Sequence, residues 1–222
     1  MAEYFTGEEM YNANVSISAD EGVSMGIITN IKEQLRNARA LKVSYETDDS
    51  AIEKHMPPAP QSEGYLALED ALKVVDRRNI IVMRVNHNGE MFLGSTHVKG
   101  SLYNDELYGK ELARLKELIS NPEGKEDRPD SEMRDIQMPD GSTRQFKVSN
   151  AVVTFQNDRG TSFDDYTKAM KLILTAYKEL REELSLEVFG KPLANLSAAE
   201  IQVIYSAIPM VVSEIEHKDI RR

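Results

Sequence analysis

The most regular pattern of hydrophobic and polar positions lies in residues 151–184, AVVTFQNDRGTSFDDYTKAMKLILTAYKELREEL. A short apolar run opens this segment, and polar turn residues follow it. Apolar residues then recur at alternating spacings of three and four, which places them on one helix face. This face consists of Phe163, Tyr166, Met170, Ile173, Tyr177, Leu180 and Leu184. The pattern predicts a strand, a tight turn and a long helix. A coiled-coil seam is the alternative, but predicted strands on both sides favour packing on a sheet.

A shorter version of this pattern occurs near the N-terminus. Residues 15–18 alternate as a strand does, a polar turn follows at 20–22, and Ser24 is in the position of a helix N-cap. Apolar residues then recur at helical spacing, and residues 41–45 alternate again. Residues 15–45 therefore predict a strand, a helix and a second strand, with a helix long enough for a right-handed parallel crossover.

The two patterns align without a gap when the first is moved along the chain by 138 positions, from Ser24 to Ser162. Glycine in each turn is expected to supply a left-handed backbone, and serine to cap each helix. The matched pairs are Val15 and Val153, Asp20 and Asp158, Gly22 and Gly160, Met25 and Phe163, and Ile28 and Tyr166. An internal repeat is the interpretation that we favour over two unrelated joints built from the same turn residues.

Residues 47–61 separate the repeat units and predict a linker. They begin with two acidic residues and end in MPPAP, a proline density that favours an extended polyproline II spacer. We therefore divide the chain into a half-domain at 1–46, an acidic and proline-rich linker at 47–61, and a larger domain at 62–222.

The larger domain is predicted to be α+β. A strand at 80–85 leads through an Asn-Gly turn into a partner strand at 90–93, and 96–98 forms a short third piece. A helix at 102–120 precedes a long mobile loop at 121–140 and a locally paired segment at 145–148. After the long helix, a capping-box helix begins at Ser197 and a last strand covers 210–215. The expected architecture is one small mixed β-sheet with helices packed on one face.

Composition and charge narrow the possible partners. Hydrophobic residues make up 41% of the chain and charged residues 29%, as in globular proteins with a core. The formal net charge is −10 and no basic cluster is present, which argues against nucleic acid or an anionic membrane as the main partner. The absence of cysteine excludes thiol chemistry and leaves the compartment open. No apolar run is long enough for a membrane-spanning helix or a signal peptide.

Familiar catalytic and metal-binding patterns are missing from the sequence. The histidines at 55, 87, 97 and 217 are scattered and lack metal-ligand spacing. Asp164 and Asp165 are in the first turn of a predicted helix, where carboxylates complement the helix dipole, so an acid–base role is the weaker interpretation. We expect neither an enzyme, nor a cofactor, nor a metal site.

The segments just described resemble the periplasmic domain of the ExbD/TolR family. VSISADEGVSMGIITNIKEQLRNARALKVSYE resembles the C-terminal half of such a domain, with its strand, turn, helix and final strand. Residues 151–191 are similar to the longer variant of Bacteroidetes members, through the NDRGT turn, AYKELR, and the Phe-Gly that ends the helix. The PPAP segment matches the spacer that follows the family's membrane anchor. The resemblance covers residues 60–216, and the first 46 residues match half a domain.

The resemblance implies a subunit of a proton-motive-force-coupled complex of the ExbB-ExbD-TonB or Tol–Pal type. It implies a homodimer at the periplasmic face of the bacterial inner membrane, with an ExbB/TolQ-like membrane subunit and a TonB/TolA-like periplasmic protein as partners. Contact with the membrane would run only through an anchor that this chain lacks, so no proton-handling residue can be assigned. The residues proposed to bind partners are Asp158, Arg159, Gly160, Asp20 and Gly22. The alternative is a free-standing protein-binding adaptor without membrane energetics.

Overall fold

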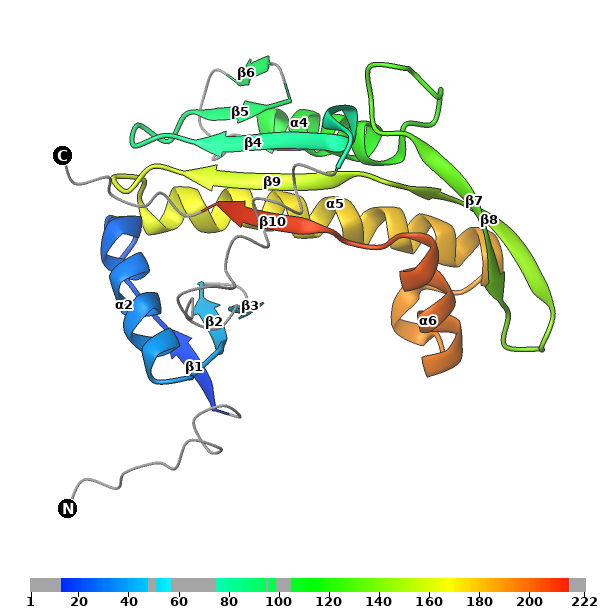
Figure 1. Cartoon of the computed structure of the whole chain (residues 1–222), viewed down its shortest axis with the longest axis horizontal. Helices are drawn as coiled ribbons and strands as arrows, with labels where there is room; N and C mark the ends of the chain where they lie inside the picture. Colours follow the sequence, from blue (N-terminus) through cyan, green and yellow to red (C-terminus); the bar gives the residue numbers. More distant parts are fainter. Residues whose placement is uncertain (1–12, 48–50, 57–74, 95, 99–104, 216–222) are drawn as a thin grey trace.

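The computed structural model describes residues 13–47, 51–56, 75–94, 96–98 and 105–215. Within them the fold is mixed α+β, as predicted, but the strands form three separate sheets and not one (Figure 1). A three-stranded sheet belongs to the N-terminal unit and a five-stranded sheet to the larger unit. A two-stranded ribbon lies at the end of the molecule opposite the N-terminal unit (Figure 1).

The N-terminal unit follows the predicted order. It consists of β1 (Asn14–Ile17), α2 (Met25–Asn37), β2 (Lys42–Glu46) and β3 (Ala51–His55). Strands β1 and β2 are parallel, which confirms the predicted parallel pairing, and β3 runs antiparallel to β2 on its other side. The sheet order is therefore β1-β2-β3.

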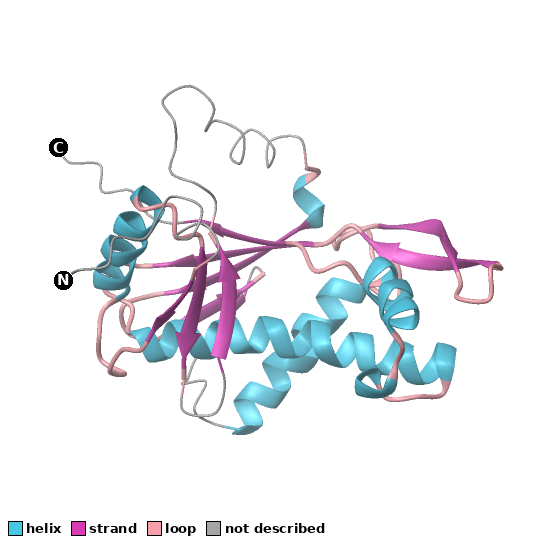
Figure 2. Cartoon of the chain, turned by 90° about the horizontal axis from the view of Figure 1, so that it is seen from below, coloured by secondary structure: helices cyan, strands magenta, loops and turns pink. Residues whose placement is uncertain are grey.

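The larger unit contains a mixed five-stranded sheet of order β10-β9-β4-β5-β6. Strands β10, β9 and β4 run parallel, whereas β5 and β6 continue as an antiparallel meander. Figure 2 shows the long helices α4 and α5 crossing each other on one side of the strands. The elements are β4 (Ile80–Val85), β5 (Met91–Leu93), β6 (Thr96–Val98), α4 (Asp105–Ser120), β9 (Val152–Asn157), α5 (Phe163–Phe189), α6 (Ala198–Ala207) and β10 (Val212–Ile215), with short 3-10 turns η1 (Arg77–Asn79) and η2 (Leu193–Asn195).

Helix α5 buries the predicted apolar face in the main core. The first five residues of that face, from Phe163 to Tyr177, are buried, and Leu180 and Leu184 are partly buried. The helix ends at Gly190, whose φ of 64° is the left-handed conformation that glycine adopts without strain. The next helix, α6, begins with the predicted capping box between Ser197 and Glu200.

The predicted mobile loop at 121–140 is wrong. Residues 131–137 form β7 (Ser131–Gln137), which pairs along its whole length with β8 (Thr143–Ser149). The preceding turn is held by Asn121, whose side-chain amide donates to the carbonyls of Lys125 and Pro129. The ribbon was missed because most β7 side chains are exposed, so the strand lacks an apolar alternation.

The predicted linker differs from the structure at residues 51–56. Strand β3 lies there, and Ile52 and Met56 are buried in the main core. These two apolar side chains anchor the segment despite its proline-rich continuation. Residues 48–50 and 57–61 of the predicted linker lie outside the described residues, as do the first helical residues predicted at 102–104.

Candidate functional site at the junction of the repeat units

The turns that open the two repeated helices lie against each other. Ser24 and Ser162 form an isolated antiparallel bridge between the units. The Met25 N–H donates to the Thr161 carbonyl at 2.8 Å, and the Phe163 N–H donates to the Val23 carbonyl at 2.7 Å. A shift of 138 positions converts the first of these bonds into the second.

A second pair of hydrogen bonds obeys the same shift. The Gly26 N–H donates to the Arg159 carbonyl at 2.8 Å, and the Asp164 N–H donates to the Glu21 carbonyl at 3.3 Å. Four reciprocal bonds between equivalent residues define a local two-fold axis at the serine pair. A contact of this kind, in which each side uses the same surface, is isologous, as in a symmetric dimer.

The strand registers agree with this equivalence. In the N-terminal unit Val15 is aligned with Val43 of β2, and in the larger unit Val153 is aligned with Val212 of β10. Strands β1 and β2 therefore correspond to β9 and β10, and α2 corresponds to the first half of α5. The repeat is therefore present in the structure as well as in the sequence. Among the described strands, β3 occurs only in the N-terminal unit, and the β4–β6 meander occurs only in the larger unit.

The residues predicted to bind a partner lie at or beside this junction. Arg159 contributes its carbonyl to Gly26 and a guanidinium N–H to Asn30 Oδ1 at 3.1 Å, so it already binds the N-terminal unit. Asp158 accepts from the His87 N–H at 3.3 Å and remains half exposed. Asp20 and Gly22 are exposed in the opposite turn. Binding of an external partner by these residues stays a prediction.

The expected backbone role of the turn glycines is wrong. Neither Gly22 nor Gly160 has a positive φ, so neither supplies a left-handed turn. At Gly160 the reason for glycine is space, because an added Cβ would lie 3.0 Å from the Cβ of His87. Gly26, which sequence reasoning did not select, is limited in the same way, since its added Cβ would lie 3.2 Å from the Arg159 carbonyl oxygen.

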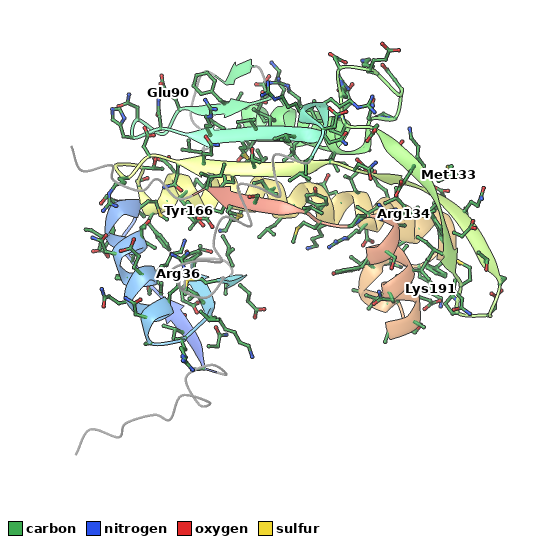
Figure 3. The ribbon with its side chains drawn as sticks, viewed as in Figure 1. Arg36, Glu90, Met133, Arg134, Tyr166 and Lys191 are labelled. Carbon is green, nitrogen blue, oxygen red and sulfur yellow. The ribbon has the colours of Figure 1, made fainter. Side chains whose placement is uncertain are left out.

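An aromatic cluster fills the space beneath the paired turns. Tyr45 of β2 stands edge-on to Phe163 and to Tyr166, with ring centroids 5.8 Å and 5.6 Å apart. Tyr166 also packs on Phe155 of β9 at 5.3 Å. Figure 3 shows Tyr166 near the start of α5, on the side of the N-terminal unit. One continuous core therefore runs through both units.

A buried ion pair crosses the same junction. The Nζ of Lys32 lies 3.5 Å from Oε1 of Glu214, and their side chains are 1% and 11% exposed. The Tyr166 hydroxyl donates to the same carboxylate oxygen at 3.0 Å. Sequence reasoning missed this pair because its members are 182 residues apart and neither belongs to a motif. The only available signal was the polar Lys32 on the inward face of an amphipathic helix.

The described residues contain no group of three or more metal-ligating side chains. His87 is an exposed neighbour of Asp158, with Nδ1 3.5 Å from its carboxylate. Deeper in α5, burial raises the pKa of Tyr177 to about 12, so this phenol stays neutral in the core. In the part of the chain that the structure describes, no helix has the length and apolarity needed to cross a bilayer.

Comparisons with known proteins give no further constraint. No family model, curated protein or solved structure matches the chain. The features that bear on function are therefore the junction, the sheet edges left unpaired among the described strands, and the resemblance found in the sequence.

Proposed function

We propose that the chain is the periplasmic part of an ExbD/TolR-type subunit of a proton-motive-force-coupled complex, and that it acts by dimerisation and partner binding. The resemblance of its two strand–turn–helix segments to that family supports the proposal. The proposed role is that of a binding protein. Recognition through backbone groups needs neither a cofactor nor a catalytic side chain.

The open edge of β10 is the observation that carries this proposal. Strand β10 is the last strand of the five-stranded sheet among the described residues. Its equivalent in the N-terminal unit, β2, has β3 paired antiparallel at the corresponding edge. The repeat thus provides an internal example of a strand bound at this position, and an extended partner segment would bind β10 in the same way.

The strand register identifies the backbone groups available for pairing. The Val153 N–H donates to the Val211 carbonyl at 3.0 Å. Because backbone groups point alternately to either side of a strand, the N–H and C=O of Val212 face away from β9. A TonB/TolA-like protein would supply the extended segment that binds there, and the same segment would transmit force to the subunit.

Binding of a synthetic peptide tests this proposal. The peptide is the extended periplasmic segment of the TonB- or TolA-like protein from the source organism, titrated against the whole chain by calorimetry. We expect binding that Val212→Pro abolishes, because proline lacks the N–H that the added strand requires. Val212→Thr keeps the N–H and is the matched control, expected to bind as the parent does. Equal binding by the proline variant would overturn the assignment of β10.

A free-standing adaptor is the second candidate, because an open edge serves any extended ligand. A neighbouring gene for a multi-span ExbB/TolQ-like protein would favour the energy-transducing complex, and its absence would favour the adaptor.

A further inference from the structure

The N-terminal unit has a second open surface, next to its junction with the larger unit. Strand β1 is the edge of its sheet among the described strands. Beside it lies a shallow groove of about 610 Å³, lined by β1, the turn at 18–23 and helix α2. Ile27 and Ile31 lie one helical turn apart on the groove and are 53% and 40% exposed.

The larger unit shows what normally covers such a surface. Strand β9, the equivalent of β1, has β4 paired along the corresponding edge, and α4 packs against α5. Ala169 of α5, the equivalent of Ile31, is fully buried there. Leu172 is also fully buried, whereas its equivalent Gln34 is exposed. The N-terminal unit lacks a counterpart of β4 and α4 among the described residues, and Ile31 is exposed where its equivalent in α5 is buried.

Helix α2 presents two of its faces to different neighbours. Gly26 and Asn30 face the larger unit, through the Arg159 carbonyl and guanidinium. Ile27 and Ile31 lie on an adjacent face, because residues one position further along a helix are rotated by about 100°. Among the described residues, the junction therefore leaves the groove and the β1 edge accessible.

We infer that a second copy of this chain covers the groove, by pairing its β1 antiparallel with β1 and packing its α2 against α2. Antiparallel pairing suits a two-fold dimer because it relates identical strands without a crossover connection. A crossover helix lies above the gap between its two strands, so the two helices would be separated by about two strand spacings. That distance, roughly 10 Å, is within the range of packed helices.

The charges at the two ends of α2 complement each other in this arrangement. Asp20 and Glu21 precede the helix and line the groove, and the exposed Arg39 follows its other end. An antiparallel pair of helices places the acidic end of one copy beside the basic end of the other. A parallel arrangement would place like charges together and would be disfavoured.

This inference names the surface of the dimer in the proposed function. The surface is argued from the structure, and only the biological role of the dimer rests on the proposed function. The surface is separate from β10, so each can fail alone. Loss of peptide binding in a chain that still dimerises would overturn the proposed function, and a monomer that still binds the peptide would overturn the dimer.

Sedimentation equilibrium of the whole chain measures the dimer directly. We expect a dimer whose dissociation constant rises by about a hundredfold or more in Ile27→Lys/Ile31→Lys, because two apolar contacts are lost and two cations are introduced. Leu186→Lys, at an exposed leucine of α5 far from the groove, is the matched control and should leave the dissociation constant unchanged. A monomeric parent, or a dimer equally weakened by both variants, would overturn the inference. So would a chain that dimerises only after residues 1–12 are removed, because those residues would then be the occupant.

Charge exchange tests the antiparallel orientation. Glu21→Arg and Arg39→Glu should each weaken self-association, and an equimolar mixture should recover it, because each contact then joins opposite charges. A mixture as weak as its components would contradict the antiparallel arrangement. Since the chain has no cysteine, single cysteines at positions 14–17 provide a second readout. We expect at least one of them to form an intermolecular disulfide, with none from a cysteine at position 186.

Discussion

The two β-α-β units of this chain have the same backbone arrangement but different neighbours, and their side chains differ accordingly. Helix α5 is covered by α4, and position 169 is a buried alanine. Helix α2 has no such cover among the described residues, and the equivalent Ile31 is exposed. At the junction, Lys32 of α2 takes the place that Met170 has in α5. A repeated backbone therefore sets where contacts occur, and substitutions within it decide which contacts are made.

The comparison predicts that the N-terminal unit is part of the fold and not an appendage. Deleting residues 1–55 removes Tyr45 from the aromatic cluster and exposes Phe163 and Tyr166. We expect the melting temperature to fall by roughly 10 °C or more, because several buried apolar side chains lose their contacts. Deletion of residues 1–12 alone is the control. An unchanged melting temperature after the longer deletion would show that the larger unit is independent.

Tyr45 should account for much of this effect. The side chain is fully buried against Phe163 and Tyr166. Tyr45→Ala is expected to cost about 3–5 kcal/mol in the free energy of unfolding, as for other buried aromatic residues. Urea denaturation measures this value, with Tyr45→Phe as the control that keeps the ring contacts. A cost below about 1 kcal/mol for the alanine variant would mean that the interface is loosely packed.

The ion pair Lys32–Glu214 is a chemical difference between the two units, because the residue of α5 equivalent to Lys32 is Met170. Lys32→Met copies the equivalent residue of α5 but leaves Glu214 without this cation. We expect a loss of about 3 kcal/mol, because removing one member of a buried pair leaves an uncompensated charge. The double variant Lys32→Met/Glu214→Gln should recover most of that loss. If the single variant is as stable as the parent, the pair is not a significant contact.

The N-cap serines of the two repeated helices should differ in their contribution to stability, and this is the smallest of the expected effects. Ser162 Oγ accepts from the Asp165 N–H at 3.0 Å, whereas Ser24 makes no side-chain cap bond. Ser162→Ala should therefore cost about 1 kcal/mol, and Ser24→Ala should cost less. Chemical denaturation of the two variants side by side measures the difference. Equal costs would remove this distinction between the units.

Much of the backbone was predictable because its signals are local. The alternation of strands, the helical spacing in α2 and α5, the turn residues and the capping box at Ser197 each act over a few residues. These signals also located the repeat, and the junction formed at the matched turns. The sequence pattern therefore marked the turns that form the junction, whereas binding of an external partner there stays a prediction.

The features that were missed depend on long-range contacts or on polar surroundings. Strand β7 has mostly exposed side chains, so its ribbon is stabilised by pairing with β8 and gives no apolar period. Strand β3 is anchored by Ile52 within a segment whose composition resembles a spacer. The expectation of one small mixed sheet was wrong, because the two units keep separate sheets and meet through turns and side chains. The burial of Lys32 could not be predicted, because its partner Glu214 is distant in the sequence and lies beside it only in the folded chain.

The central claim is that both repeat units unfold together because they have one core. Differential scanning calorimetry of the whole chain at a fixed concentration tests this claim most directly. We predict a single transition in which the calorimetric and van't Hoff enthalpies agree, and which moves as a whole in Tyr45→Ala. Two resolved transitions, with only the lower one moved by that substitution, would contradict it.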